Sequence, residues 1–304
     1  MRVACIGECM VELVEHPDGS LTRAFGGDTL NTALYLARLG VAVDYVTALG
    51  DDPWSDAMVE AWAREGIGLQ AVARLPGRVP GLYVIRTDAA GERSFHYWRE
   101  TSAARDLFAA SEAAAARAAL ARYDLAYLSG ISLSLYGDTG RATLFEALNT
   151  LRKGGGRVAF DMNYRPRGWL DAAQARAAVE TAMATADLIF ASREDLTGLY
   201  SGNGVDALLR HRGRAEIVLR ETRAGVAHAR VFHGDDEAMI PAEPVASVID
   251  TTAAGDSFAA GYLAARLAGR TPVAAAGIGH QLAGVVIRHR GAVIPKDAMR
   301  EFQA

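Results

Sequence analysis

Short apolar, β-rich runs alternate along this chain with longer segments whose apolar residues recur at helical spacing. The short runs predict strands at 2–7, 45–49, 125–130, 157–163, 187–192 and 216–220. Helices are expected near 28–39, 55–65, 110–121, 139–152, 172–185, 204–212, 256–268 and 272–288. This alternation is typical of the α/β class, in which helices flank both faces of a mostly parallel sheet and ligands bind at the carboxyl ends of its strands.

One segment, GLYVIRTDAAGERSFHYWR at 81–99, departs from this alternation because it contains two β-rich runs around DAAGE. A type I turn followed by Gly91 in the left-handed region would close a three-residue hairpin loop. That register pairs Tyr83 with Tyr97 and puts Arg99 on the same face. We expect either a lid over a polar ligand, with both tyrosines partly exposed when the ligand is absent, or an ordinary edge hairpin with amphipathic aromatic residues.

Composition narrows the class of function. The 304 residues are half apolar, enough for a sizeable core in one large domain or a large domain with a small one. The net charge of −4 argues against a nucleic-acid partner. No apolar run reaches membrane-spanning length, and the N-terminus lacks a basic-then-apolar signal segment. We therefore expect a cytoplasmic protein with no membrane partner.

The two cysteines, Cys5 and Cys9, lie in the first predicted strand and just after it. They could be half of a metal site or a disulfide, but their spacing is poor for either. We expect two buried thiols in a reduced compartment.

The stretch DTTAAGDSFAAGYLAA at 250–265 places Asp256 at the start of a predicted helix. A helix N-terminus leaves backbone N–H groups unpaired and carries a partial positive charge. The small residues at 253–255 let another group approach that backbone closely. Such a turn predicts an anion site, most often for phosphate. In the alternative interpretation, Asp256 only caps the helix.

Two further clusters carry polar side chains at predicted turns. In FGGDTLN at 25–31, glycines open a helix whose first turn holds Asp28 and Asn31, although a glycine turn with an Asp cap would look the same. In DMNYRPRGW, Asn163 and Arg165 directly follow a strand, at the edge where ligands bind, whereas Arg167 is expected to be solvated. Neither a GxGxxG nor a GxxxxGK[ST] loop is present. Phosphate binding would therefore use the helix start at 253–258 and arginines.

GGDTLN near the N-terminus and DTTAAGD near the C-terminus, in this order, resemble the ribokinase-like (phosphofructokinase-B) family of carbohydrate kinases over essentially the whole chain. Within that family, IGECMVEL, YVTALGDD, YLSGISL and NYRPR are most similar to kinases of 2-keto-3-deoxygluconate. The resemblance implies one ribokinase-like α/β domain over 1–304. It also implies a small β-sheet lid made from about 9–25 and 74–102, and a homo-oligomer, since lids pair into dimers in several members.

The resemblance also implies a reaction, the ATP-dependent phosphorylation of 2-dehydro-3-deoxy-D-gluconate to its 6-phosphate with Mg²⁺. Asp256 would be the general base, because a sugar hydroxyl attacks only as its proton leaves. The implied anion hole consists of the amides of Ala253, Ala254, Gly255 and Asp256. The implied substrate residues are Gly27, Asp28, Asn31, Tyr83, Tyr97, Arg99, Arg165 and Asp256.

The implied nucleotide contacts are Asn163, Arg220, Gly225 and the 253–255 amides. Two positions depart from the family pattern. Its Lys-x-Gly is Arg220-Glu221-Thr222 here, and its Asn-x-x-Glu, linked to magnesium, is Ser192-Arg193-Glu194-Asp195. Asp195 is therefore the expected acidic group near Mg²⁺, acting through water.

Three other functions compete with this one. A fructokinase-like enzyme would not call for Arg99 and Arg165, because neutral sugars lack the carboxylate that guanidinium groups bind. A non-catalytic sugar-binding homologue would not need Gly255 and Asp256 intact. A nicotinamide dehydrogenase on a similar sheet would carry the dinucleotide fingerprint that is missing here.

Overall fold

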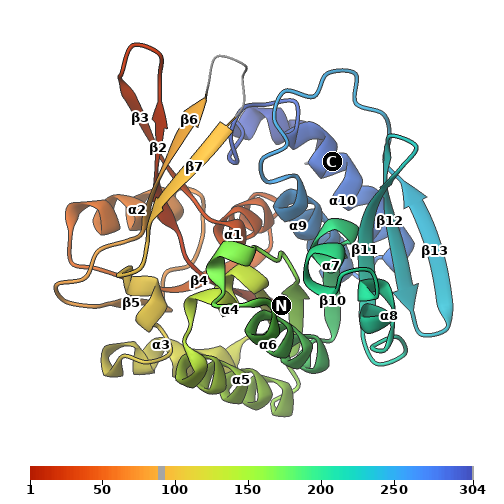
Figure 1. The fold of residues 1–304 in the computed structure, drawn as a ribbon, viewed down its shortest axis with the longest axis horizontal. Coiled ribbons are helices and arrows are strands. Elements are labelled where there is room, and N and C mark those ends of the chain that lie inside the picture. Colours follow the sequence, from red (N-terminus) through yellow and green to blue (C-terminus); the bar gives the residue numbers. More distant parts are fainter. Residues whose placement is uncertain (88–92, 303–304) are drawn as a thin grey trace.

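In a computed structural model, which describes residues 1–87 and 93–302, nine strands of the described chain form the main sheet. They are β1 (Arg2–Ile6), β4 (Ala42–Leu49), β5 (Val72–Arg74), β8 (Leu125–Ser129), β9 (Arg157–Asp161), β10 (Leu188–Ser192), β11 (Glu216–Arg223), β12 (Val226–His233) and β13 (Asp236–Pro241). Their order is β13-β12-β11-β10-β9-β8-β1-β4-β5 (Figure 1). All neighbours from β5 to β11 run parallel, and β12 is antiparallel to both of its neighbours. The mostly parallel sheet is confirmed.

Helices cover both faces of this sheet, as predicted (Figure 1). One face packs against α1 (Asp28–Arg38), α2 (Pro53–Arg64), α9 (Ala254–Leu267) and α10 (Pro272–Val286). The other packs against α3 (Ala114–Ala119), α4 (Gly130–Leu135), α5 (Asp138–Lys153), α6 (Ala172–Thr185), α7 (Arg193–Tyr200) and α8 (Gly204–Leu209). Short 3-10 helices occur at Ala103–Asp106, Ser111–Ala113, Leu120–Arg122, Pro166–Gly168 and Lys296–Phe302.

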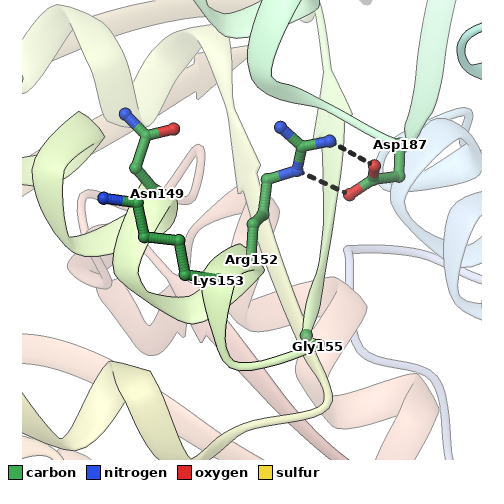
Figure 2. A pocket seen from close by; sticks show the side chains of 6 residues that line it. Asn149, Arg152, Lys153, Gly155 and Asp187 are labelled. Atoms are coloured by element: carbon green, nitrogen blue, oxygen red, sulfur yellow. Dashed lines mark hydrogen bonds and ion pairs between the residues drawn. The ribbon is translucent and has the colours of Figure 1, made fainter.

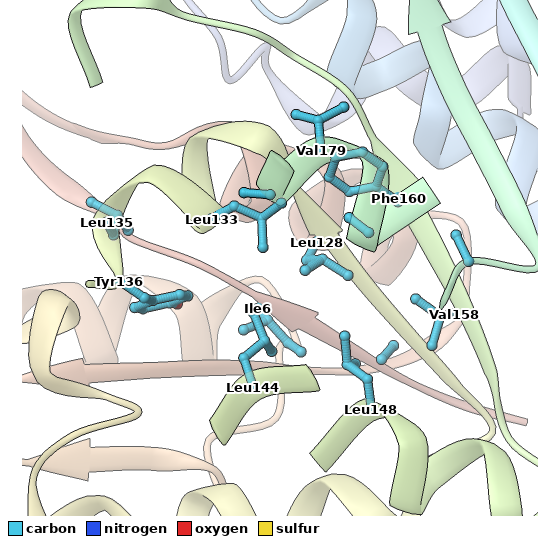
Figure 3. Packing of buried hydrophobic residues seen from close by; sticks show 14 of the residues in the cluster. Ile6, Leu128, Leu133, Leu135, Tyr136, Leu144, Leu148, Val158, Phe160 and Val179 are labelled. Carbon is cyan, nitrogen blue, oxygen red and sulfur yellow. The ribbon is translucent and has the colours of Figure 1, made fainter. Parts of the chain in front are cut away.

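Each face has its own apolar core, because successive side chains of a strand point to opposite sides. In β9, Phe160 belongs to one core and its neighbour Ala159 to the other. Figure 3 shows Phe160 with Leu144 and Leu148 of α5 and Val179 of α6. Fully burying one such side chain contributes about 1.5–3 kcal/mol. These cores hold the strand ends, and the side chains that follow them, in fixed positions.

Four further strands of the described chain form a separate small sheet: β2 (Met10–Glu15), β3 (Leu21–Gly26), β6 (Leu82–Thr87) and β7 (Arg93–Trp98). Its order is β3-β2-β6-β7, with β2 and β6 parallel and the other pairs antiparallel. Figure 1 shows it projecting from the α/β body beside α1 and α2. The predicted pairing of Tyr83 with Tyr97 is confirmed. The predicted turn at Gly91 lies outside the described residues.

The helix expected at 110–121 is present, although only α3 is α-helical and a 3-10 turn flanks it on each side. Two strands were not predicted: β12 and β13 form the edge of the sheet and carry many polar residues. The start of the second lid segment needs correction too, because residues 72–74 belong to β5 of the main sheet.

Cys5 and Cys9 are both buried and unpaired, as expected. Burial raises the pKa of each thiol, so neither is a ready nucleophile. None of the helices in the described part of the chain is both long and apolar enough to span a membrane.

Candidate active site

The first turn of α9 carries the acid singled out in the sequence. Ala253, in the left-handed region at φ 60°, precedes the helix, and no side chain in the described part of the chain caps it. Asp256 is the third helical residue, and its carboxylate accepts a hydrogen bond from Nδ2 of Asn31 at 2.8 Å. The capping interpretation of Asp256 is therefore wrong. The amide of Ala254 donates to the carbonyl of Thr251 at 3.2 Å, so it is partly used within the turn itself.

The surroundings of Asp256 make it an unusually basic carboxylate. Burial, the charge of Asp28 and the charge of Asp161 raise the pKa of Asp256, and the Asn31 hydrogen bond and Arg220 offset only part of this rise. Oδ1 of Asn31 is buried and has no hydrogen-bond partner among the described residues. A carboxylate whose pKa is raised accepts a proton more readily near neutral pH.

The glycine turn before α1 lies in the same place. Gly27 precedes the helix, and a side chain there would collide with the carbonyl of Glu8, so only glycine fits. Asp28 opens α1; its Oδ1 accepts from the Thr29 amide and its Oδ2 from Nδ2 of Asn163, both at 2.8 Å. Asn163, just beyond β9, is held in the left-handed region at φ 28°. The predicted cluster of polar groups from two helix starts and a strand end therefore exists.

An ion pair that the sequence analysis missed lies beside this cluster. Nη2 of Arg220 donates to both carboxylate oxygens of Asp161, at 2.9 and 3.0 Å. Asp161 ends β9 and is buried, and burial raises its pKa to about 6 despite the neighbouring guanidinium. The signal for Asp161 was available, because it stands two residues before Asn163 at the end of a predicted strand.

Arg165 lies at the same edge of the sheet. Its side chain is 60% exposed, and its Nη1 lies 3.1 Å from Oδ1 of Asp195. Oδ2 of the buried Asp195 accepts from the hydroxyl of Ser192 at 2.7 Å. Arg167 is exposed, as expected. No group of three or more His, Cys, Asp or Glu side chains able to hold a metal was found among the described residues.

The lid residues are only partly placed as expected. Tyr97 is 43% exposed, but Tyr83 is buried, and its hydroxyl donates to Glu12, so the expectation that both would be exposed is wrong. Arg99 pairs with the buried carboxylate of Glu8, a residue that the sequence analysis missed. Arg99 and Arg165 thus have different carboxylate partners, and none of the contacts in the described chain joins the two arginines.

The residues after Arg220 continue β11 and then turn directly into β12. Gly225 lies in the exposed two-residue turn that joins β11 to β12, at φ 78°. Thr222, at the family's glycine position, is exposed, whereas Glu221 is buried between Arg193 and Arg223. These contacts fix the strand end next to Arg220.

A pocket at the amino ends of the strands, opposite the candidate site, is separate from this cluster. It is lined by Asn149, Arg152, Lys153, Gly155, Gly156 and Asp187, between the end of α5 and the starts of β9 and β10 (Figure 2). Arg152 donates to both oxygens of Asp187, at 2.9 and 3.3 Å, and Asp187 also accepts from the Val158 amide. This ion pair joins the end of α5 to the residue that precedes β10. Its role is structural.

The comparisons agree with the architecture and the motifs. Residues 1–299 match the model of the pfkB family of carbohydrate kinases. The 2-dehydro-3-deoxygluconokinases of Dickeya dadantii and Escherichia coli K12 are 43% and 41% identical to this chain, over 98% of both chains in each case. The crystal structure of the enzyme of that name from Thermotoga maritima is 22% identical, with a TM-score of 0.80 over 99% of this chain and 98% of that one. This chain therefore belongs to the pfkB family of carbohydrate kinases.

Proposed function

We propose that this protein is a 2-dehydro-3-deoxygluconokinase, which transfers the γ-phosphoryl group of ATP to the 6-hydroxyl of 2-dehydro-3-deoxy-D-gluconate. Relatives of that name at 41–43% identity support the substrate. One structural observation carries the chemistry: Asp256 lies in the first turn of α9, and Nδ2 of Asn31 is the one hydrogen-bond donor to its carboxylate among the described residues. Base and anion site then belong to one rigid element.

Asp256 is the proposed general base, and it takes the proton of the 6-hydroxyl as the oxygen attacks phosphorus. Asn31 donates to one carboxylate oxygen and so fixes the orientation of the group without supplying a counter-charge. The amides of Gly255 and Asp256 are the main proposed donors to the transferred phosphoryl group, since the amide of Ala254 is already used by the turn. Ala253 shapes that turn.

The sugar is proposed to bind between the start of α1 and the lid. Asp28 and Asn163 present a carboxylate and an amide that hydrogen-bond each other, and both have further capacity for sugar hydroxyls. Gly27 keeps the backbone close to them. Tyr97 is an exposed aromatic residue of the lid and would cover the ligand, whereas Tyr83 packs beside it from the neighbouring strand β6, with its ring centroid 5.6 Å away.

Arg165 is the better candidate for the substrate carboxylate. Its side chain is largely exposed and keeps donors beyond its contact with Asp195. Arg99 is already neutralised by Glu8, although its buried Nε has no partner among the described residues. A role for Arg99 at the substrate therefore requires that it keeps Glu8 as a partner and uses another nitrogen.

ATP is proposed to lie on the side of Arg220 and Gly225, with its phosphates toward Asn163 and α9. Magnesium that arrives with ATP is held mainly by phosphates and waters, so it does not need a cage of protein ligands. Asp195 fits a contact through water, because its carboxylate keeps acceptor capacity beyond Arg165 and Ser192. When bound, the ion would neutralise phosphate charge. A homo-oligomer formed through the lid remains a prediction.

The substrate class can be tested with one coupled assay. Initial rates with ATP and magnesium are measured for the keto-deoxy acid, fructose, ribose and adenosine. We expect kcat/KM to be highest for the keto-deoxy acid. In Arg165→Ala this value should fall about 10- to 100-fold, the scale of one charge-assisted hydrogen bond, while the weak rate on fructose changes little.

Arg167→Ala is the matched control, since Arg167 is an exposed neighbour. A wild-type preference for fructose would contradict the proposed substrate and leave the family membership standing.

A further inference from the structure

We propose that Arg220 is a catalytic residue that completes the anion site at the start of α9, and that Asp161 is the positioning residue that holds it there. This inference rests on the proposed kinase function and deepens it. It replaces the expectation that Arg220 only flanks the nucleotide.

The register of the sheet brings the two residues together. Asp161 on β9 is level with Phe190 on β10, which is level with Val218 on β11. Arg220 stands two residues beyond Val218, so its side chain leaves the same face of the sheet as that of Asp161. This is the face covered by α1 and α9.

The guanidinium has one nitrogen held and another turned to the helix start. Its hydrogen bonds within the described chain run from Nη2 to the two oxygens of Asp161. Its Nε is buried and has no partner among the described residues. Its Nη1 lies 2.6 Å from the point that a Cβ atom of Gly255 would occupy. The nitrogen opposite the anchored one therefore lies directly against the proposed anion site.

This contact explains the glycine. Gly255 is helical and does not have a positive φ, so the backbone would accept alanine there. Gly255 is needed because it leaves room for Nη1 of Arg220. In the described chain, the three atoms nearest to the point that this Cβ would occupy all belong to the Arg220 guanidinium. A glycine in the first turn of α9 and an arginine 35 positions earlier thus form one feature.

The negative charges around Arg220 explain why a fixed cation is useful at this position. Asp28, Asp161 and Asp256 are close enough to influence one another, and together they would repel an incoming phosphoryl group. Burial lowers the pKa of Arg220, but the charges of Asp161, Asp195 and Asp256 more than compensate, so the guanidinium stays protonated. A fixed cation at this point would stabilise the charge that spreads over the phosphoryl oxygens during transfer.

Arginine suits this task better than lysine. Its planar fork lets Asp161 hold one nitrogen while a second nitrogen faces the ligand. An ammonium group is a point charge at the end of a flexible stem, and it would be drawn to Asp161 itself. We therefore expect Arg220→Lys to be only partly active.

The test is steady-state kinetics of the full-length enzyme with ATP, magnesium and the keto-deoxy acid. Arg220→Ala should lower kcat about 100- to 1,000-fold, as for loss of one oxyanion donor, with little change in KM for ATP. Added guanidinium ion should restore part of this kcat. Asp161→Asn should lower kcat about 10-fold and should not respond to guanidinium, because the arginine is still present but poorly held.

The pair of Arg152 and Asp187 is the matched control, since it is also an arginine held by both aspartate oxygens, at the opposite edge of the sheet. Arg152→Ala should leave kcat unchanged and should not respond to guanidinium. If Arg220→Ala raises KM for ATP and leaves kcat unchanged, Arg220 only binds the nucleotide. If it loses kcat together with thermal stability and guanidinium restores neither, the pair is structural. Either result overturns the proposal.

Gly255→Ala gives a second test with the ion pair intact. Its methyl group should displace Nη1 and lower kcat, but should have little further effect in Arg220→Ala. If the fold-reductions in kcat of the two single variants multiply in the double variant, Gly255 and Arg220 act independently, and the proposed contact is contradicted. If the wild-type enzyme prefers another sugar, the proposed substrate fails, and the same variants measured on that sugar still decide the role of Arg220.

Discussion

Asp161 and Asp256 differ in the partner that holds each carboxylate. Asp161 is bound by a guanidinium and Asp256 by an amide. A guanidinium stabilises the ionised carboxylate and occupies its oxygens. An amide orients a carboxylate that can still accept a proton. Burial raises the pKa of both groups, but only Asp256 lies in the first turn of α9. Two similar residues can therefore serve as anchor and base.

The raised pKa of Asp256 predicts a pH dependence. The base acts only when deprotonated, so kcat/KM should rise with pH through this pKa, at a higher pH than for an ordinary aspartate. Since the charge of Asp28 helps to raise the pKa, Asp28→Asn should move the acidic limb of the profile to lower pH, even if the overall rate falls.

Asp138→Asn is the control for this profile, because Asp138 is an exposed residue of α5 whose partner is Arg141 in the same helix. An acidic limb that stays in place in Asp28→Asn would show that another group controls it.

At the scale of elements, the site is assembled from two helix starts and the ends of three strands. Asp28 and Asn31 are three residues apart in α1 and so share one face of its first turn. Sequence spacing was enough to place both of them, as well as Asp256, at helix starts. It did not predict the contact of Asn31 with Asp256, which spans 225 residues, nor that of Arg220 with Asp161, which spans 59. Such contacts depend on sheet order and register.

The small sheet is expected to act as a lid over the ligand. If it is a lid, amide hydrogen exchange in β6 and β7 should slow when the keto-deoxy acid and a non-hydrolysable ATP analogue are bound, because closure excludes water. Exchange in β13, at the far edge of the main sheet, should stay the same. Unchanged exchange throughout 82–87 and 93–98 would favour the ordinary edge hairpin.

At the scale of the whole molecule, the alternation of strands and helices was enough to predict the fold class and that the candidate residues would gather at the carboxyl ends of the strands. The sequence did not reveal that Glu8, on the way from β1 to β2, would be buried against Arg99. Its position follows from packing the small sheet onto the body, which no local pattern records. The edge strands β12 and β13 were missed for a different reason, because their many polar residues interrupt any apolar run.

The most direct test of the account is turnover by Asp256→Asn. We expect kcat to fall at least about 100-fold, the scale of losing a general base, while the midpoint of thermal unfolding and ATP affinity stay close to wild type. The amide keeps the size of the side chain but cannot accept the proton of the 6-hydroxyl. Asp138→Asn should retain full activity. Turnover by Asp256→Asn near the wild-type value would contradict the central claim that Asp256 is the base.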